Sequence, residues 1–90
     1  MANVKQKEVT VYTTDICPYC RAAKDLLKKK EIAYVEVNVT HDEDKRKWLQ
    51  EKTGQRTVPQ IFFDDESIGG YNDLADLDQK GLLQLKVRGS

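Results

Sequence analysis

Hydrophobic and polar residues alternate in some segments of the chain and recur at helical spacing in others. Residues 8–13 alternate, with Val9 and Val11 on the apolar side, a pattern typical of a strand rich in β-branched residues. Residues 18–30 instead place apolar side chains at helical spacing, opposite a basic face. Pro18 suits the first turn of a helix, because its missing N–H would have no partner there. The pattern therefore predicts a strand followed directly by a helix.

The same reasoning predicts three more strands and two more helical regions. The expected strands cover residues 32–39, 59–64 and 67–68, and an expected helix over 42–52 ends at a Gly54 cap. A final helical region should bury Leu74, Leu77, Leu82, Leu83 and Leu85. The strand–helix–strand opening implies two parallel strands joined by a right-handed crossover, and the later strand–turn–strand is a hairpin. The expected order βαβαββα defines an α/β fold, a single thioredoxin-like domain with a four-stranded mixed sheet and helices on both faces.

Length and charge narrow the class of protein. A chain of 90 residues forms one domain, which we place at 8–87, after a polar lead at 1–7 and before a vector-like scar at 88–90. The 15 basic and 15 acidic side chains cancel, so nothing favours a nucleic-acid partner. No apolar run approaches the ~20 residues that span a membrane, and the polar start lacks a secretory signal. We therefore expect a cytoplasmic monomer that binds neither nucleic acid nor membrane.

The two cysteines, Cys17 and Cys20, lie three residues apart. A disulfide-stapled secreted domain of this size usually carries four or more cysteines at wider spacing. A structural zinc site needs four ligands, and the only histidine, His41, lies about twenty residues away in a charged segment. We therefore expect no metal site and interpret the pair as a redox dithiol.

The position of the pair, between a strand and a helix, gives each cysteine a role. Residues three apart at a helix start lie on one face, which brings their Cα atoms within the ~4.4–6.8 Å that a disulfide allows. Cys17 at the N-cap faces free backbone N–H groups, which lower a thiol pKa and favour the nucleophilic thiolate. We expect Cys17 to attack a substrate disulfide and the deeper Cys20 to be the resolving thiol. Tyr19 should form an aromatic wall beside them.

A second segment, Thr57-Val58-Pro59, precedes the third expected strand. A cis bond before Pro59 would leave the backbone of Val58 exposed beside the thiols, although only ~5–6% of X–Pro bonds are cis. The N–H and C=O of Val58 would then be free to pair with an extended peptide as a short added strand.

Three segments in register together resemble a dithiol glutaredoxin of the CPYC type. They are Cys17-Pro18-Tyr19-Cys20, residues 57–62 (TVPQIF) and residues 69–74 (GGYNDL), and the spacing agrees across residues 8–86. The resemblance implies a glutathione-dependent oxidoreductase that reduces protein disulfides and glutathione mixed disulfides. Its partners would be glutathione, as a co-substrate, and disulfide-bearing or glutathionylated proteins, with no tightly bound cofactor.

The resemblance also implies which residues bind glutathione. Tyr19 would line the groove, Val58 would pair with glutathione through its backbone after Thr57, and Pro59 would be the cis-proline of the family. The turn at Gly69 and Gly70 would lead through Tyr71 into a helix start, where Asn72 and Asp73 hold the γ-glutamyl end. Helix-start N–H groups suit a carboxylate, and the Asp73 carboxylate suits an ammonium. Arg46 and Arg56 lie where the family often places partners for the glycyl carboxylate, although either is equally well a plain surface charge.

The chain departs from the family at Thr14, where many glutaredoxins carry a lysine three residues before the leading cysteine. Asp15 adds a negative charge nearby, and both changes disfavour a thiolate. Our hypothesis is that the pKa of Cys17 is higher, and glutathione binding weaker, than in a lysine-bearing relative.

Three alternatives remain open. The first is a glutaredoxin-like redoxin reduced by thioredoxin reductase, which would donate electrons to an enzyme such as ribonucleotide reductase. The second is a dimer in which Cys17 of each chain and two glutathiones hold an iron–sulfur cluster. The last is a scaffold with inert cysteines.

Overall fold

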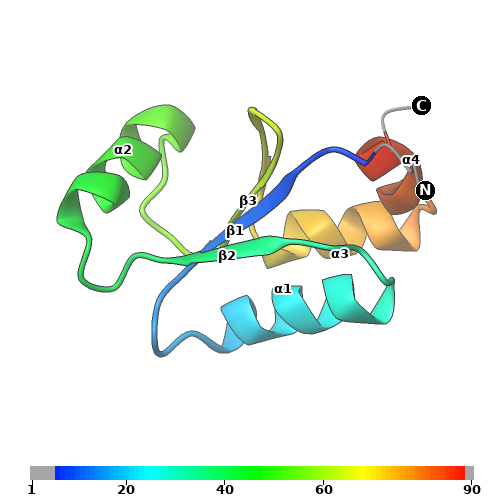
Figure 1. Cartoon of the computed structure of the whole chain (residues 1–90), viewed down its shortest axis with the longest axis horizontal. Coiled ribbons are helices and arrows are strands. Elements are labelled where there is room, and N and C mark those ends of the chain that lie inside the picture. The colour runs from blue at the N-terminus through cyan, green and yellow to red at the C-terminus, as the bar shows by residue number, and fades with distance from the viewer. Residues whose placement is uncertain (1–5, 89–90) are drawn as a thin grey trace.

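Strands and helices alternate along residues 6–88, the part of the chain that this computed structural model describes (Figure 1). In chain order the elements are β1 (Val9–Thr13), α1 (Pro18–Lys29), β2 (Val35–Asn38), α2 (Glu43–Thr53), β3 (Gln60–Phe63), β4 (Glu66–Gly69), α3 (Tyr71–Gln79) and α4 (Leu83–Arg88). None of these helices is long and apolar enough to cross a membrane.

The four strands form one mixed sheet in the order β2-β1-β3-β4. β1 and β2 run parallel, as a crossover through α1 requires, with Val11 opposite Glu36. β3 is antiparallel to both β1 and β4. The expected four-stranded mixed sheet is confirmed, and the loop after β1 carries the cysteine pair to one end of this sheet.

One face of the sheet holds most of the core. α1 and α3 lie on this side (Figure 1), and α4 packs into the same cluster, where Val9 and Val11 of β1 meet Ile61 and Phe63 of β3. The alternation in β1 is therefore the predicted one. The other buried members of this cluster are Ala23, Leu27, Ile32, Leu74, Leu83 and Val87. Such continuous burial fixes α1, and with it the cysteines at its start.

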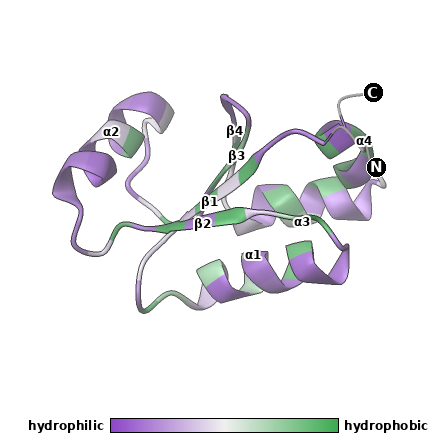
Figure 2. Cartoon of the chain, viewed as in Figure 1, coloured by the Kyte–Doolittle hydropathy of each residue, from purple (hydrophilic) through white to green (hydrophobic). Residues whose placement is uncertain are grey.

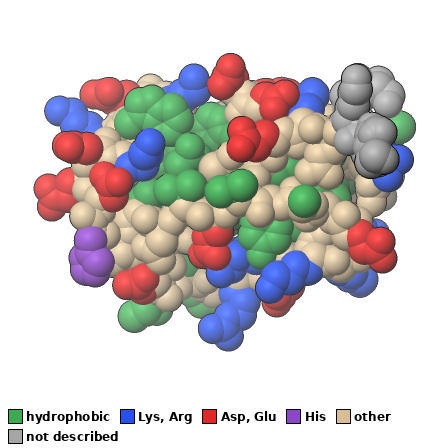
Figure 3. All heavy atoms as spheres, in the orientation of Figure 1, with side chains coloured by type: hydrophobic (Ala, Val, Ile, Leu, Met, Phe, Trp, Pro, Cys, Tyr) green, Lys and Arg blue, Asp and Glu red, His purple; other side chains and the backbone are tan. Residues whose placement is uncertain are grey.

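Within residues 6–88, the opposite face carries only α2 and a much smaller buried cluster. Val39, Leu49 and Phe62 are buried there, and α2 is mostly hydrophilic along its length (Figure 2). Trp48 stacks near Phe62, with 6.0 Å between the ring centroids, yet keeps 40% of its surface exposed. Hydrophobic atoms between α2 and the sheet are visible at the surface in Figure 3. The helices thus cover both faces, as expected, but unequally.

Two expectations about the elements need correction. The second strand covers only Val35–Asn38, the residues that pair with Thr10–Thr13 of β1. The final helical region is two helices, separated by a turn in which Gly81 has φ 72°. That turn resets the helical phase, so Leu82 and Leu85 are exposed rather than buried.

The expected domain boundaries fall partly outside the described residues. Residues 1–5 of the polar lead and residues 89–90 of the scar are not described. Near these ends, the N–H of Lys7 donates to the carbonyl of Val87 at 2.7 Å, and Arg88 is the last residue of α4.

Candidate active site at the cysteine pair

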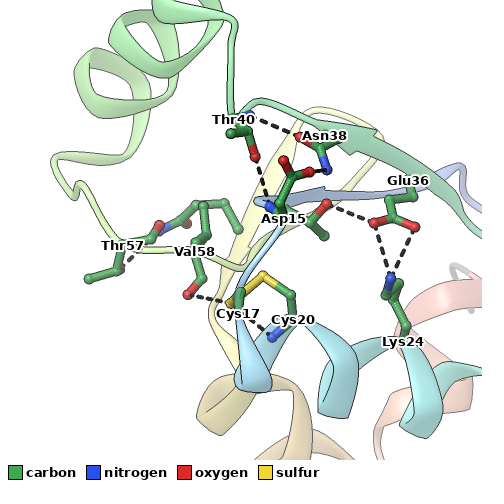
Figure 4. Close-up of a disulfide and its surroundings, with 11 residues drawn as sticks. Asp15, Cys17, Cys20, Lys24, Glu36, Asn38, Thr40, Thr57 and Val58 are labelled. Atoms are coloured by element: carbon green, nitrogen blue, oxygen red, sulfur yellow. Dashed lines mark hydrogen bonds and ion pairs between the residues drawn. A yellow bond between two sulfur atoms is a disulfide. The ribbon is translucent and has the colours of Figure 1, made fainter.

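Cys17 lies at the N-cap of α1, where its extended backbone (φ −156°, ψ 97°) ends the loop from β1. Its Sγ accepts a hydrogen bond from the N–H of Cys20 at 3.1 Å. A disulfide joins Cys17 and Cys20, with their Cα atoms 5.2 Å apart (Figure 4). The helix start therefore supplies both the geometry for a disulfide and a backbone donor for the Cys17 sulfur.

The two cysteines differ in burial. Cys17 is half-buried, whereas Cys20 is only 2% exposed. A substrate disulfide can therefore reach the Cys17 sulfur from outside, whereas Cys20 is shielded from it. This is the difference in depth that the sequence predicts for the nucleophile and the resolving thiol.

Val58 lies directly beside the Cys17 sulfur. The Val58–Pro59 peptide bond is cis, as the resemblance implies. The carbonyl oxygen of Val58 lies 3.7 Å from the Cys17 Sγ (Figure 4). Val58 is half-buried, and Pro59, directly before β3, is buried. The structure therefore brings an accessible stretch of backbone to the nucleophile.

A groove of about 330 Å³ lies beside Val58. It is lined by Tyr19, Gln55, Thr57, Val58, Pro59, Gly70, Tyr71, Asn72 and Asp73. All of these residues except Gln55 are expected glutathione-binding residues, and the fold gathers them from three separate segments. Tyr19 and Tyr71 approach each other across this groove, with 6.1 Å between the ring centroids. Gln55 lies in an irregular stretch between α2 and β3, where the sequence carries no periodic signal.

The start of α3 forms one wall of the groove. The Asp73 carboxylate accepts a hydrogen bond from the N–H of Gly70 at 3.0 Å, so it caps this helix. Gly69, just before the Gly70 cap of α3, has φ 117°, and a Cβ atom at Gly69 would collide with the Asp73 carboxylate. Gly69 therefore allows the strand-to-helix turn that holds Asp73 in place.

Gln60 is buried behind the lining of the groove and contacts Thr57. The sequence does not predict it as a site residue. Its side chain is 1% exposed, and its Nε2 donates to the carbonyl of Thr57 at 2.9 Å. The same nitrogen lies 3.4 Å from the Gln55 Oε1 and 3.4 Å from the Thr57 Oγ1. The Gln60 Oε1, by contrast, has no hydrogen-bond partner within the described structure. No local sequence pattern indicates this role, because it depends on the burial of Gln60 and on its contact with Thr57.

A second hollow, of about 400 Å³, also adjoins the cysteines. It is lined by Thr14, Asp15, Ile16, Cys17, Pro18, Cys20, Arg21 and Lys24. Thr14 thus adjoins the dithiol but is absent from the lining of the groove. The Asp15 carboxylate accepts a hydrogen bond from the Asn38 Nδ2 at 2.8 Å, and the Asp15 N–H donates to the Thr40 hydroxyl at 2.7 Å.

A carboxylate behind this hollow joins three elements of the fold. Glu36 of β2 accepts a hydrogen bond from the Thr13 hydroxyl at 2.7 Å and pairs with the Lys24 ammonium at 3.1 Å (Figure 4). The Thr13 hydrogen bond is the main cause that lowers the pKa of Glu36 below its ordinary value, and Lys24 lowers it further. Desolvation opposes both effects. Glu36 therefore stays ionised at neutral pH.

Arg46 and Arg56 do not line the groove. They share a separate hollow of about 250 Å³ with Glu43, Lys47 and Gln50, between α2 and the chain that follows it. A role for these arginines in binding a glycyl carboxylate stays a prediction. Across residues 6–88, no three His, Cys, Asp or Glu side chains lie together in a way that could hold a metal ion.

Fold and site together define a class, a small dithiol protein of thioredoxin-like architecture. Within that class, the glutaredoxin family profile matches residues 9–68. Glutaredoxin 3 of Escherichia coli strain K12 is 42% identical over 81 residues, which cover 90% of this chain and 92% of the relative. Glutaredoxin 1 of Rickettsia conorii is 44% identical over 77 residues, covering 83% of this chain and 76% of the relative. The chain belongs to the glutaredoxin family.

Solved structures agree with this assignment. The solution structure of glutaredoxin from Brucella melitensis has a TM-score of 0.84 and 34% identity, covering 93% of this chain and 91% of that one. A buckwheat glutaredoxin–glutathione complex has a TM-score of 0.83 and 26% identity, covering 93% and 79%. Family membership and the Cys17–Cys20 pair make this chain a thiol–disulfide oxidoreductase.

Proposed function

We propose that this protein uses glutathione to reduce protein disulfides and glutathione mixed disulfides in the cytoplasm. The observation that carries the proposal is the groove that opens beside the half-buried Cys17 sulfur. Its lining combines an accessible backbone at Val58 with a fixed carboxylate at Asp73. These groups suit a small peptide that carries both a backbone and a free ammonium group.

The proposed deglutathionylation proceeds in two exchanges at Cys17. The Cys17 thiolate attacks the glutathione sulfur of a mixed disulfide, and the protein thiolate leaves and takes up a proton. A second glutathione, as its thiolate, then attacks the glutathione sulfur bound to Cys17. This step releases glutathione disulfide and restores the Cys17 thiolate, so one free glutathione is consumed and the glutathione of the mixed disulfide leaves as the other half of the glutathione disulfide.

Reduction of a protein disulfide uses both cysteines. The Cys17 thiolate attacks one substrate sulfur, and the Cys20 thiolate then attacks the Cys17 sulfur and releases the substrate as a dithiol. The enzyme is left with the Cys17–Cys20 disulfide, which is the bond present in the structure. Two glutathiones reduce it and leave as glutathione disulfide. In both reactions, the hydrogen bond from the Cys20 N–H favours Cys17 as the thiolate.

The proposal is tested by turnover of a glutathione mixed disulfide with glutathione, glutathione reductase and NADPH. The parent should be active, Cys17→Ser inactive and Cys20→Ser still active, since both exchanges take place at Cys17. A Cys17→Ser variant that keeps its activity would contradict the assignment of the nucleophile. An inactive parent that thioredoxin reductase can reduce would contradict the choice of glutathione.

A further inference from the structure

Lys24 lies beside the dithiol and forms an ion pair with Glu36. It lies four residues after Cys20 on α1, so the two side chains occupy neighbouring positions on one helix face. Lys24 and both cysteines line the same hollow of about 400 Å³. An ammonium group in this position contributes a positive potential at the sulfurs without contacting the groove on the other side of Cys17.

Glu36 determines where that ammonium group lies. Both of its carboxylate oxygens contact the Lys24 Nζ, at 3.1 and 3.2 Å, and the Thr13 hydroxyl fixes the carboxylate from β1. Thr13 is fully buried, so this anchor belongs to the sheet itself. The pair is only partly exposed, with 26% of the Lys24 side chain and 35% of the Glu36 side chain accessible, which limits screening by solvent.

The other charges around the dithiol come from several elements. Asp15, from the loop, is hydrogen-bonded to Asn38, and Arg21 of α1 lines the hollow. Asp73 of α3 faces the groove, where it caps its own helix. Thr14 is neutral, so both cations in the hollow come from α1. Of these two, Lys24 is the one that an anion restrains in the described structure.

We propose that Lys24 is the cation that stabilises the reduced thiolate form of the Cys17–Cys20 pair, and that Glu36 is a positioning residue that holds Lys24 and offsets part of its charge. The inference deepens the proposed function, because it concerns the same dithiol. It predicts opposite effects for the two partners of one ion pair. Removing Lys24 destabilises the thiolate, whereas removing the Glu36 charge stabilises it.

The relevant equilibrium is the exchange of the enzyme disulfide and two glutathiones for the enzyme dithiol and glutathione disulfide. A cation near the thiolate favours the dithiol side, because only the reduced enzyme carries the negative charge. Lys24→Gln should shift this equilibrium toward the enzyme disulfide by about threefold, which is roughly 14 mV at 29.6 mV per tenfold. Glu36→Gln should shift it in the other direction by a similar factor.

The experiment titrates the ultraviolet absorbance of the Cys17 thiolate and measures the glutathione equilibrium for the parent, Lys24→Gln and Glu36→Gln. Lys24→Gln should raise the pKa of Cys17 and Glu36→Gln should lower it, each by roughly half a pH unit. Lys24→Arg, which keeps the charge, should stay close to the parent. Lys29→Gln serves as a matched control, because Lys29 is an exposed lysine in the last turn of α1.

Opposite shifts in the two variants, with Lys29→Gln unchanged, support the proposal. Shifts of the same sign, or an unchanged pKa in either variant, would overturn it. A purely structural pair would lower the unfolding temperature of both variants and leave the pKa of Cys17 unchanged. Neither measurement uses turnover or a protein substrate, so the outcome is independent of whether glutathione is the physiological reductant.

Discussion

The two hollows beside Cys17 are built from different groups. The groove on one side is lined by backbone, aromatic and polar groups from the first turn of α1, the chain just before β3 and the start of α3, where Asp73 supplies the one carboxylate of the lining. The hollow on the other side is lined by the loop after β1 and by the charged face of α1, with Arg21 and Lys24. The first arrangement suits recognition of a peptide-like ligand, and the second suits control of the charge on sulfur. Changes in the groove should therefore alter KM, and changes in the charged hollow should alter the pKa of Cys17.

The largest effect should follow Gly69→Ala. A Cβ atom at this position collides with the Asp73 carboxylate, and φ 117° is strained for any L-residue. We expect a loss of about 2–3 kcal/mol in the free energy of unfolding and a rise in KM for a glutathione mixed disulfide of more than about tenfold, which corresponds to 1.4 kcal/mol. Thermal unfolding and steady-state kinetics measure both.

Gly81→Ala is the control for Gly69→Ala. Gly81 also has positive φ, 72°, but a Cβ atom added there would have no atom within 4 Å of it. This variant should lose only about 1 kcal/mol of stability, with KM unchanged. An equal rise in KM in both variants would show that backbone strain alone, rather than the position of Asp73, disturbs the groove.

The next effect should come from Asp73→Asn. The amide oxygen can still accept from the Gly70 N–H, so the cap survives while the charge is lost. Because hydrogen bonds to charged groups contribute about 1.5–3 kcal/mol, KM should rise about tenfold or more. The pKa of Cys17 should change little, and Asp76→Asn, on the exposed side of α3, should match the parent in kinetics. An unchanged KM would remove Asp73 from the binding groups.

A smaller effect is expected for Gln60→Met. Methionine keeps the volume of the side chain and removes the unpartnered Oε1, so stability should stay within about 1 kcal/mol of the parent. The hydrogen bond to Thr57 is also lost, so the segment that presents Val58 is less well fixed. We expect KM to rise about threefold, roughly 0.7 kcal/mol, without a change in the pKa of Cys17. An unchanged KM in a stable variant would contradict a supporting role for Gln60.

Thr14→Lys tests the charged hollow on the α1 side of Cys17. Lysine adds a cation at a position that lines the hollow with Cys17, so the thiolate should be favoured and the pKa of Cys17 should fall. We expect roughly threefold faster alkylation below neutral pH, together with tighter glutathione binding. A pKa that is unchanged or raised would contradict the hypothesis drawn from Thr14.

The smallest effect concerns stability in acid. The pKa of Glu36 is lowered in the folded protein, mainly by Thr13, so its contribution is present above the ordinary glutamate pKa and is lost as pH falls through the lowered value. The free energy of unfolding of the parent should exceed that of Glu36→Gln by roughly 0.2–1 kcal/mol at neutral pH, and this difference should shrink in acid. Unfolding curves from neutral to acidic pH measure it. A difference that grows in acid would contradict the lowered pKa.

The sequence predicts best where a local pattern and the tertiary environment agree. The alternation of Val9 and Val11 matches a strand with one densely packed face, and Pro18 begins α1 as expected. The burial of the leucines after Leu77 does not follow from the sequence pattern, because the turn at Gly81 breaks in the structure a periodicity that continues in the sequence. Leu85 consequently points to solvent.

The candidate site was predictable where motifs carry it and not where it depends on distant contacts. The cysteines and the residues around Val58 and Asp73 were expected, and they line the site together. The pairing of Lys24 with Glu36 depends on the register of β1 with β2, which no local pattern specifies. The same limit applies to Gln60, whose role becomes visible only once its burial beneath Thr57 is known.

The most direct test of the account is to locate glutathione on the protein. Cys20→Ser, loaded with glutathione on Cys17, should be compared by NMR with its unloaded thiol form. The account predicts that backbone shifts change mainly at residues 55–59 and 69–74, which form the groove. Changes confined to residues 14–16 and 21–24, around the charged hollow, would contradict the assignment of the groove as the glutathione site.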